Sequence, residues 1–477
     1  MSLSTFYKMA IGMLMLQFVN CFCLFAQNKR PNIIFILTDD QRWDALGFAG
    51  NSIIQTPQID SLALSGKYFK NAFSSTPICA ASRASILTGL YERTHAYTFQ
   101  KPRLKDPYVQ LMYPKILKDS GYYVGFFGKL GVIIDSAHNY FDISDFYDRK
   151  EEFGRQGYYY KQINGDTVHL TQYTGFQARN FIKSVPADKP FCLSLSFSAP
   201  HAHDASIEQY FVENNDTSIY TSQKIPLQPL SDSTYFNQLP LAVREGYNRL
   251  RWTWRFDTQE KYQQMVRAYY QMISELDAEI GLIRKQLELK GLADNTVIIV
   301  MGDNGYFLGD RQLADKWLMY EPSIRIPLVI YDPRFKKPNV INQMVLNIDL
   351  PKTILEIATV TAPTAYQGKS LAPLIRDSNF NLNRHSILIE HLWDFPKIPS
   401  SEGIRTDRWK YFRYRYINVP EELYDLRNDP LEKVNLAANK KYKKVLSKLR
   451  SEFKALSLEY ENQKLCPDDA FLKDQKF

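Results

Sequence analysis

The sequence predicts an α/β fold: a sandwich built on a large parallel or mixed sheet, followed by a smaller C-terminal antiparallel sheet and a helix. Four short apolar runs each precede a loop of polar residues, which is typical of strands buried on both faces. Helical patterns lie between these runs, as in an α/β sandwich. Near residue 365 the pattern changes to short strands separated by turns, which indicates a second, smaller unit.

The first 26 residues resemble a signal peptide rather than a part of the fold. Lys8 supplies a positive charge, an apolar run follows it, and Ala26 offers a cleavage point before Gln27. No later run reaches the roughly 18 apolar residues of a membrane span. We therefore expect an exported protein, periplasmic or secreted, without a transmembrane anchor.

Residues 27–365 are expected to form one large domain. Its clearest helix runs from about Thr258 to Lys290, where apolar residues recur at helical spacing, and Gly291 stands where a helix cap belongs. The four apolar runs supply strands of its central sheet, at residues 32–38, 122–127, 191–197 and 296–301.

Residues 366–477 are expected to form the C-terminal subdomain. A basic amphipathic helix follows its strands, and we expect the apolar face of this helix to cover the small sheet rather than to bind a membrane. The expected strands are residues 386–390, 403–406, 409–416 and 422–425.

Charge and cysteine content narrow the class of protein. The chain carries a net charge of +8, which suits polyanionic substrates without identifying the chemistry. No block of lysine and arginine indicates a nucleic-acid-binding arm, so no nucleic-acid partner is expected. Beyond the leader only Cys79, Cys192 and Cys466 remain, too far apart for a disulfide framework.

Two acidic turns directly follow two of the expected strands. Asp39 and Asp40 follow the first strand, and Asp303 and Asn304 follow the fourth. If these strands end side by side, their oxygen atoms could bind a hard divalent cation. For each turn alone, a solvated turn or a helix cap is the simpler interpretation.

Cys79 stands just ahead of a helix-forming run, and Arg83 follows one helical turn later. The positive end of a helix and a nearby guanidinium both favour a thiolate or a bound anion. Without further context, a buried cysteine beside a surface arginine is the simpler interpretation of this pattern.

The wider context of Cys79 resembles the signature of type I sulfatases, a family of the alkaline-phosphatase-like superfamily. In that family this cysteine is converted after translation to formylglycine, the catalytic aldehyde. The resemblance covers nearly the whole mature chain. Its motifs are residues 76–89 around C-x-A-x-R, 121–129 (GY…GK), 199–201 (APH), 302–305 (GDNG), Lys316, and 429–436 (DPLEKVNL).

The resemblance implies a sulfatase that depends on formylglycine and one calcium ion and acts on sulfated carbohydrate. A sulfatase-maturating enzyme would act on Cys79 before or during export. The implied calcium ligands are Asp39, Asp40, Cys79 as formylglycine, Asp303 and Asn304.

The implied catalytic residues suit the chemistry of a sulfate ester. The anionic sulfate needs its charge neutralised, which Arg83, Lys129 and Lys316 can do together with the metal. A sugar alkoxide is a poor leaving group and needs a proton, which His201 could give. The second hydroxyl of the hydrated aldehyde then offers a route for sulfate release.

The chain departs from the family pattern at three positions. Gly131 stands where the family often has a histidine, and His95 and His138 are the candidates to replace that histidine. Arg311 also stands where many relatives carry a histidine, and Ala81 where proline is commoner.

Five further residues are candidates for a sugar subsite, although residues of these types are more often surface or packing residues. They are His95, His203, Glu390, His391 and Arg405.

Two other functions remain open from the sequence. One is a phosphonate or phosphate ester hydrolase of the same superfamily. The other is a non-catalytic sulfoglycan-binding protein in which Cys79 is unmodified. A two-zinc phosphatase is disfavoured, because Asp303 and Asn304 suit calcium better than zinc.

Overall fold

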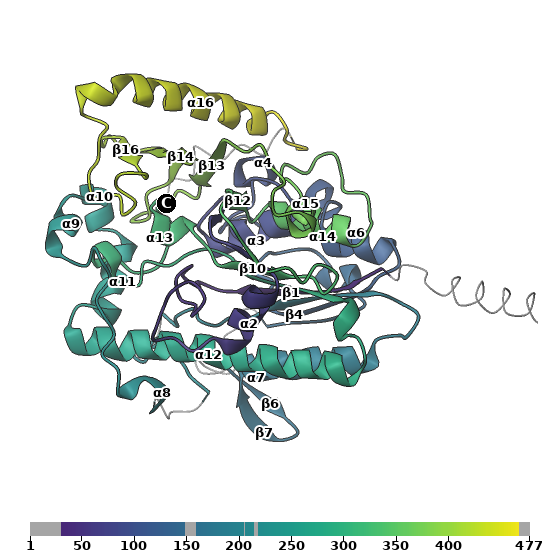
Figure 1. Cartoon of the computed structure of the whole chain (residues 1–477). Coiled ribbons are helices and arrows are strands. Elements are labelled where there is room, and N and C mark those ends of the chain that lie inside the picture. Colours follow the sequence, from purple (N-terminus) through teal and green to yellow (C-terminus); the bar gives the residue numbers. More distant parts are fainter. Residues whose placement is uncertain (1–29, 148–158, 205, 214–217, 467–477) are drawn as a thin grey trace, which may run out of the picture.

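The computed structural model describes residues 30–147, 159–204, 206–213 and 218–466 (Figure 1). The expected signal peptide, residues 1–26, lies outside the described residues. Within the described part of the chain, no helix combines the length and the apolar character needed to cross a membrane.

The centre of the molecule is an eight-stranded mixed sheet, as the sequence predicts. β10 runs antiparallel to both of its neighbours, and the other pairs are parallel. The strand order is β11 (Asn339–Ile341), β2 (Lys67–Phe69), β10 (Leu328–Tyr331), β9 (Thr296–Gly302), β1 (Asn32–Thr38), β8 (Phe191–Ser196), β4 (Tyr123–Gly128) and β5 (Ile143–Phe146).

The four strands predicted from apolar runs are the adjacent strands β9, β1, β8 and β4. Both faces of these strands are covered, which explains why their sequences are apolar rather than alternating. Along β1, Ile33 and Phe35 face one core while Ile34 and Ile36 face the other. Successive side chains of a strand point to opposite faces, so a single strand supplies both cores.

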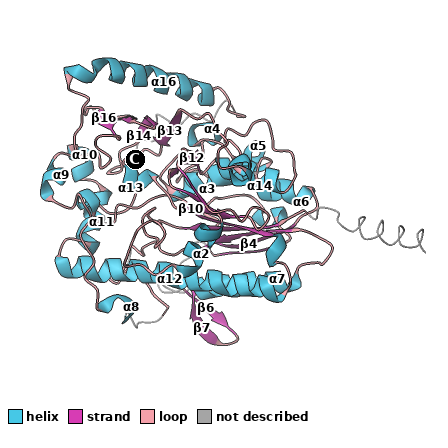
Figure 2. Ribbon diagram, viewed as in Figure 1, coloured by secondary structure: helices cyan, strands magenta, loops and turns pink. Residues whose placement is uncertain are grey.

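Helices cover both faces of the sheet (Figures 1 and 2). The long helix spans Gln259–Leu289 close to the predicted range, and Gly291 follows it with φ +66°. One face carries α2 (Pro57–Ser65), α7 (Leu170–Ser184) and α12 (Gln259–Leu289), and the other carries α3 (Cys79–Thr88), α6 (Tyr113–Asp119) and α14 (Asp349–Ile357).

The C-terminal unit is an antiparallel sheet covered by a helix, as predicted. Leu446, Leu449 and Phe453 of the helix belong to the same core as the strands. The elements, in the order of the sheet, are β13 (Ser386–His391), β14 (Ser401–Thr406), β15 (Trp409–Tyr414) and β16 (Glu422–Asp425), covered by α16 (Lys443–Glu461).

The core contacts of the residues after 365 bear on where the C-terminal unit begins. Leu374 and Ile375, which follow the boundary expected at residue 365, still pack into the core of the large sheet. We therefore propose that the C-terminal unit begins nearer Ser386.

The remaining described elements are short. The short elements are β3 (Ala72–Phe73), α4 (Glu92–His95), α5 (Asp106–Val109), η1 (Ala137–Tyr140), β6 (Tyr160–Ile163), β7 (Asp166–His169), α8 (Ser218–Thr221), α9 (Ser233–Asn237), α10 (Leu241–Arg244), α11 (Tyr247–Arg255), η4 (Ala293–Asn295), η5 (Asp310–Gln312), α13 (Glu321–Ile324), β12 (Val345–Leu346), α15 (Ala372–Arg376) and η6 (Lys440–Tyr442).

Candidate active site

The two acidic turns meet at one edge of the central sheet. β1 and β9 are parallel neighbours whose last residues are paired, so the turns that follow them lie side by side. The backbone N–H of Asp40 donates to Asp303 Oδ1 at 3.2 Å, and Asn304 Nδ2 donates to Asp40 Oδ1 at 2.7 Å. All four residues of the two turns are almost completely buried. The structure thus brings all four residues together.

Three cations hold the three carboxylates in place. Arg83 Nε donates to Asp303 Oδ2 at 3.0 Å, and Lys316 Nζ donates to both oxygens of Asp40 at 2.6 and 2.7 Å. Lys129 donates to Asp39. Because all of these side chains are buried, the ion pairs are little weakened by solvent.

The carboxylates differ in their affinity for a proton. Burial raises the pKa of Asp39, but the neighbouring cations, above all Lys129, outweigh it and lower the pKa to about 2. Burial also raises the pKa of Asp40, although Lys316 opposes this shift. Burial and the Asp39 carboxylate raise the pKa of Asp303 to about 7. Burial therefore disfavours the charged form of Asp40 and Asp303, whereas the neighbouring cations keep Asp39 charged.

Two buried oxygens of the cluster have no hydrogen-bond partner among the described residues. They are Asp39 Oδ1 and Asn304 Oδ1. A buried polar atom without a partner is costly, and a bound cation removes that cost. Carboxylate and amide oxygens are the ligands that calcium prefers. The donor set therefore fits a hard divalent cation.

Cys79 is the first residue of α3, and Arg83 follows one turn later in the same helix. Both side chains are buried, Cys79 with 6% of its surface exposed. Arg83 Nη1 donates to the backbone oxygen of Lys129 at 2.7 Å and to Ser196 Oγ at 2.5 Å. Arg83 thus ties the helix to the ends of β4, β8 and β9, whereas Cys79 faces a cavity.

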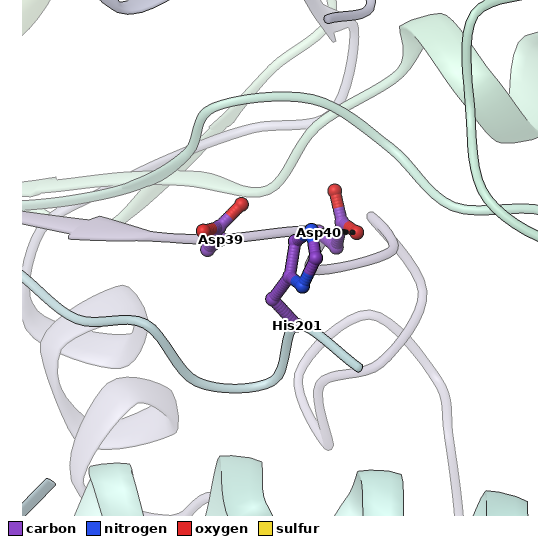
Figure 3. A group of neighbouring side chains, drawn as sticks. All are labelled: Asp39, Asp40 and His201. Atoms are coloured by element: carbon purple, nitrogen blue, oxygen red, sulfur yellow. Dashed lines mark ion pairs between the residues drawn. The ribbon is translucent and has the colours of Figure 1, made fainter. Parts of the chain in front are cut away.

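His201 lies beside Asp40, with its ring aimed at the carboxylate (Figure 3). The distance from His201 Nε2 to Asp40 Oδ2 is 3.5 Å. His201 Nδ1 lies 2.6 Å from the backbone oxygen of Ala202. A contact this short to a carbonyl requires a proton on Nδ1, so Nε2 carries a proton only when the ring is charged.

These side chains open into a cavity of about 630 Å³. Its floor combines the cysteine with the two lysines and the histidine, and its walls are mainly aromatic. The lining residues are Cys79, Tyr97, Phe99, Lys129, Gly131, Ile133, His201, Asp204, Tyr247, Arg251, Lys316, Trp317, Trp393, Phe395 and Ile398. A volume of this size is within the range of about 300–1,000 Å³ that small-molecule sites occupy.

Comparison with known families shows to which family this chain belongs. The family model described as "Sulfatase" matches residues 31–360, more than two thirds of the chain. The chain belongs to the sulfatase family. A second model, described as "N-sulphoglucosamine sulphohydrolase, C-terminal", matches residues 309–459. The chain is therefore a sulfuric ester hydrolase, and the expected family is confirmed.

Named relatives agree with this family. An N-acetylglucosamine-6-O-sulfatase of Bacteroides thetaiotaomicron is 27% identical over 91% of this chain and 88% of the relative. An ulvan-active sulfatase of Formosa agariphila is 26% identical over 89% of this chain and 83% of the relative.

Two solved structures share the fold of this chain, which confirms the expected α/β fold with a second, smaller sheet. One protein, bound to its substrate D-glucosamine-2-N,6-O-disulfate, has a TM-score of 0.76 and 24% identity, and the match covers 94% of this chain and all of that one. A phosphonate monoester hydrolase of Agrobacterium radiobacter has a TM-score of 0.73 and 21% identity, covering 90% and 96%.

The five residues expected to form a sugar subsite do not line the cavity of the sulfatase. Glu390 is buried in an ion pair with Arg93 at 2.6 Å, and Arg405 pairs with Glu321 at 2.9 Å. His203 packs its ring against Phe211. Ion pairing and packing occupy these side chains, so the sequence expectation is not supported by their placement.

The two other histidines of that expectation, His95 and His391, are also fully buried. Burial lowers the pKa of each to about 3, so both rings are neutral. His95 Nε2 contacts Ser85 Oγ at 3.0 Å, and its Nδ1 accepts from the backbone of Tyr97. His95 thus joins the end of α4 to Ser85 of α3 and to the backbone that follows α4, as a structural residue does.

Gly131 leaves no room for the histidine that the family often has there. Its φ is +69°, and an added Cβ would lie 2.5 Å from Arg83 Cδ. Neither His95 nor His138, the candidates to replace that histidine, lines the cavity. Arg311 instead donates to the backbone of Glu432 and joins the active-site loop to the C-terminal unit.

Sequence reasoning missed part of the cavity wall. Tyr247 and Arg251 come from α11, and Arg251 pairs with Asp204 at 2.8 Å and with Asp315 at 2.5 Å. Asp315 precedes Lys316, so this pair also fixes the loop that carries the lysine. An aromatic and an arginine on a short helix form no recognisable motif, and no signal in the sequence singled them out.

Proposed function

We propose that this sulfatase removes sulfate from a sulfated carbohydrate of the glycan or glycosaminoglycan type, with Cys79 converted to formylglycine and one calcium ion bound. One observation carries the proposal: Cys79, Lys129, His201 and Lys316 line one cavity directly beside the buried acidic cluster.

The relatives support the substrate class. They include an N-acetylglucosamine-6-O-sulfatase and an ulvan-active sulfatase, and a structural neighbour was solved with a disulfated glucosamine. Aromatic side chains form much of the wall, including Trp393 and Phe395, which stack with ring centroids 4.6 Å apart. Such surfaces bury the apolar face of a ligand while a few polar groups orient it.

We assign calcium to Asp39, Asp40, Asp303, Asn304 and the modified residue at 79. The unpartnered oxygens of Asp39 and Asn304 support this assignment. When present, the hydrated aldehyde would supply the attacking hydroxyl, and the calcium ion would neutralise charge on the sulfate.

The chain's own residues would position and neutralise the sulfate. The Lys129 and Lys316 side chains reach the cavity and offer positive charge to the sulfate oxygens. Arg83 is absent from the cavity lining, so we propose that it acts as a positioning residue through Asp303 and the backbone of Lys129. This differs from the direct sulfate contact that the sequence indicated.

His201 would give a proton to the departing sugar oxygen. With Nδ1 held by the carbonyl of Ala202, the charged ring carries its transferable proton on Nε2. The Asp40 carboxylate lies 3.5 Å from that atom, so His201 Nε2 stands beside the proposed metal ligands. Loss of the Nε2 proton leaves a neutral ring that keeps its hydrogen bond to Ala202.

Modification of Cys79 would have to precede folding. Only 6% of the residue is exposed, inside a helix whose residues are all buried. We therefore propose that a sulfatase-maturating enzyme acts on the unfolded chain before or during export to the periplasm or medium.

The test combines mass analysis with paired substrates. Trypsin should release residues 71–83, and the mass of this peptide distinguishes an aldehyde or its hydrate from a free thiol. We expect the aldehyde, and Cys79→Ala should abolish hydrolysis of a panel of sulfated mono- and disaccharides without loss of fold.

Two results would contradict the proposal. A free thiol in a protein that binds but does not cleave sulfated glycans would indicate a binding protein. Faster hydrolysis of an aryl phosphonate than of the matched aryl sulfate would indicate a phosphonate ester hydrolase, the activity of one structural neighbour.

A further inference from the structure

One short segment of the chain is strongly basic. Residues 433–454 contain eight lysines and arginines and one glutamate. This segment therefore supplies seven of the eight net positive charges of a chain of 477 residues. All eight cations are exposed, and they are Lys433, Lys440, Lys441, Lys443, Lys444, Lys448, Arg450 and Lys454.

These cations are placed where they oppose the stability of their helix. The N-terminus of a helix disfavours positive charge, yet Lys443 and Lys444 occupy the first turn of α16, which has no acidic residue. Lys444 and Lys448 are four residues apart, as are Arg450 and Lys454, and like charges at this spacing repel. Charges that weaken their own helix without stabilising another part of the protein are typical of functional surfaces.

Most of these charges have no acidic partner in the described part of the chain. Among these eight cations and the described residues around them, only Arg450 has an acidic partner, Glu421. The lysines of α16 are thus available to an external polyanion. α16 lies along an outer edge of the molecule, with its apolar side on the small sheet (Figure 1).

A cleft of about 430 Å³ runs beside this helix, between α16 and the small sheet. Lys443, Arg450 and Lys454 share one stripe of the helix, since they are spaced by seven and four residues. Arg450 and Lys454 line the cleft, and Arg413 stands on the opposite wall with half of its side chain exposed. Two glutamates share the lining: Glu402 pairs with Arg413 at 2.7 Å and Glu421 pairs with Arg450, so among these three cations only Lys454 has no acidic partner in the described part of the chain. Ser457 also lines it, with a buried hydroxyl that has no hydrogen-bond partner among the described residues.

We propose that α16 and this cleft form an accessory binding site for a sulfated polysaccharide chain, separate from the catalytic cavity. Arginines and lysines along a groove match the repeated sulfates of such a chain. The assignment of a glycan, rather than another polyanion, rests on the proposed function. The same small sheet also carries the β13–β14 connection, whose Trp393 and Phe395 line the catalytic cavity.

A membrane surface fits this site less well. Helices that bind membranes bury an apolar face in the lipid. In α16 that face is already used, because Leu446, Leu449 and Phe453 pack against the sheet. What remains exposed is a charged surface bordering a cleft.

The test measures binding by the full chain carrying Cys79→Ala, which prevents turnover. The helix variant replaces four exposed lysines of α16, Lys443, Lys444, Lys448 and Lys454, with glutamine. The control replaces four other exposed lysines with glutamine, which makes the same change in net charge at distant positions: Lys183, Lys189, Lys224 and Lys290. The probes are dextran sulfate, uncharged dextran, phosphatidylglycerol vesicles and poly(dT).

We expect dextran sulfate to bind the parent at low ionic strength and to bind the helix variant about tenfold more weakly, with little change in the control. Uncharged dextran should not bind. In the background with Cys79 intact, both variants should hydrolyse 4-nitrophenyl sulfate as the wild type does, which also shows that they fold.

Equal affinity of dextran sulfate for the helix variant and its parent would overturn the proposal, as would equal losses in variant and control. Tighter binding of vesicles or poly(dT) than of dextran sulfate, dependent on the same lysines, would assign the surface to a membrane or a nucleic acid instead. If the lysines govern dextran sulfate binding but the wild type cleaves no sulfated carbohydrate, the accessory site stands and the proposed function fails.

Discussion

Replacing Gly131 with alanine should displace Arg83 and slow the enzyme. The added Cβ would lie 2.5 Å from Arg83 Cδ, whereas ordinary contact begins near 3.4 Å, so the two must separate by about 0.9 Å. Arg83 holds Asp303 and the backbone of Lys129, so both would move with it. A misplacement of about 1 Å can cost about 100-fold in rate, and we expect a fall of that order in kcat/KM for 4-nitrophenyl sulfate.

The same change should also lower stability, through two separable effects. A left-handed backbone costs an alanine about 1–2 kcal/mol, and overpacking a full site costs about 1–3 kcal/mol more. Gly291→Ala isolates the first effect, because Gly291 has nearly the same φ, +66°, and no atom within 4 Å of an added Cβ. The free energy of unfolding, measured in urea for both variants, should therefore fall further for Gly131→Ala.

The comparison has a clear refuting result. If the two alanine variants lose the same stability, and Gly131→Ala keeps the wild-type kcat/KM, then Arg83 is not confined by position 131. Crowding by Arg83 would then not explain why a glycine replaces the family's histidine at this position.

Four further predictions follow from the site and its surroundings. His201→Ala should lose about 10²–10⁴-fold activity on a sugar sulfate but much less on 4-nitrophenyl sulfate, whose leaving group hardly needs a proton; equal losses would make His201 a positioning residue. Removing divalent ions with a chelator should lower both activity and the midpoint of thermal unfolding, and calcium rather than zinc should restore them. Trp393→Ala should raise KM for the sugar sulfate and leave kcat unchanged. Arg405→Met should instead leave KM unchanged and lower the free energy of unfolding by about 2–3 kcal/mol, because the bond from Arg405 to Glu321 is buried. Burial lowers the pKa of His95 to about 3 in the folded protein, against about 6.5 in the unfolded chain, so the stability that its neutral ring contributes is complete above pH 6.5 and is lost as the pH falls toward 3. His95→Gln should therefore reduce the loss of unfolding free energy between pH 7 and pH 5 by about 2 kcal/mol. An unchanged pH profile would contradict the neutral ring.

The sequence by itself determined the family, the central strands and the acidic cluster. Strands buried on both faces leave continuous apolar runs, so β1 and β9 were visible without any partner. Asp39 and Asp303 were found because each directly follows such a strand, and the family motifs indicated that the two strands end side by side. These features are local in sequence: a run, a turn after it, and a motif of a few residues around Cys79.

The tertiary structure alone decided which side chains line the cavity. Glu390 and Arg405 are polar residues in the C-terminal region, and the sequence could not show that their partners are Arg93 and Glu321. The walls of the cavity likewise come from segments hundreds of residues apart, such as Phe99 and Trp393, whose rings lie 5.3 Å apart. Burial and pairing depend on such distant contacts, which leave no periodicity or spacing in the chain. A cavity is therefore a property of the packed molecule, whereas a strand and the turn that follows it are properties of a segment.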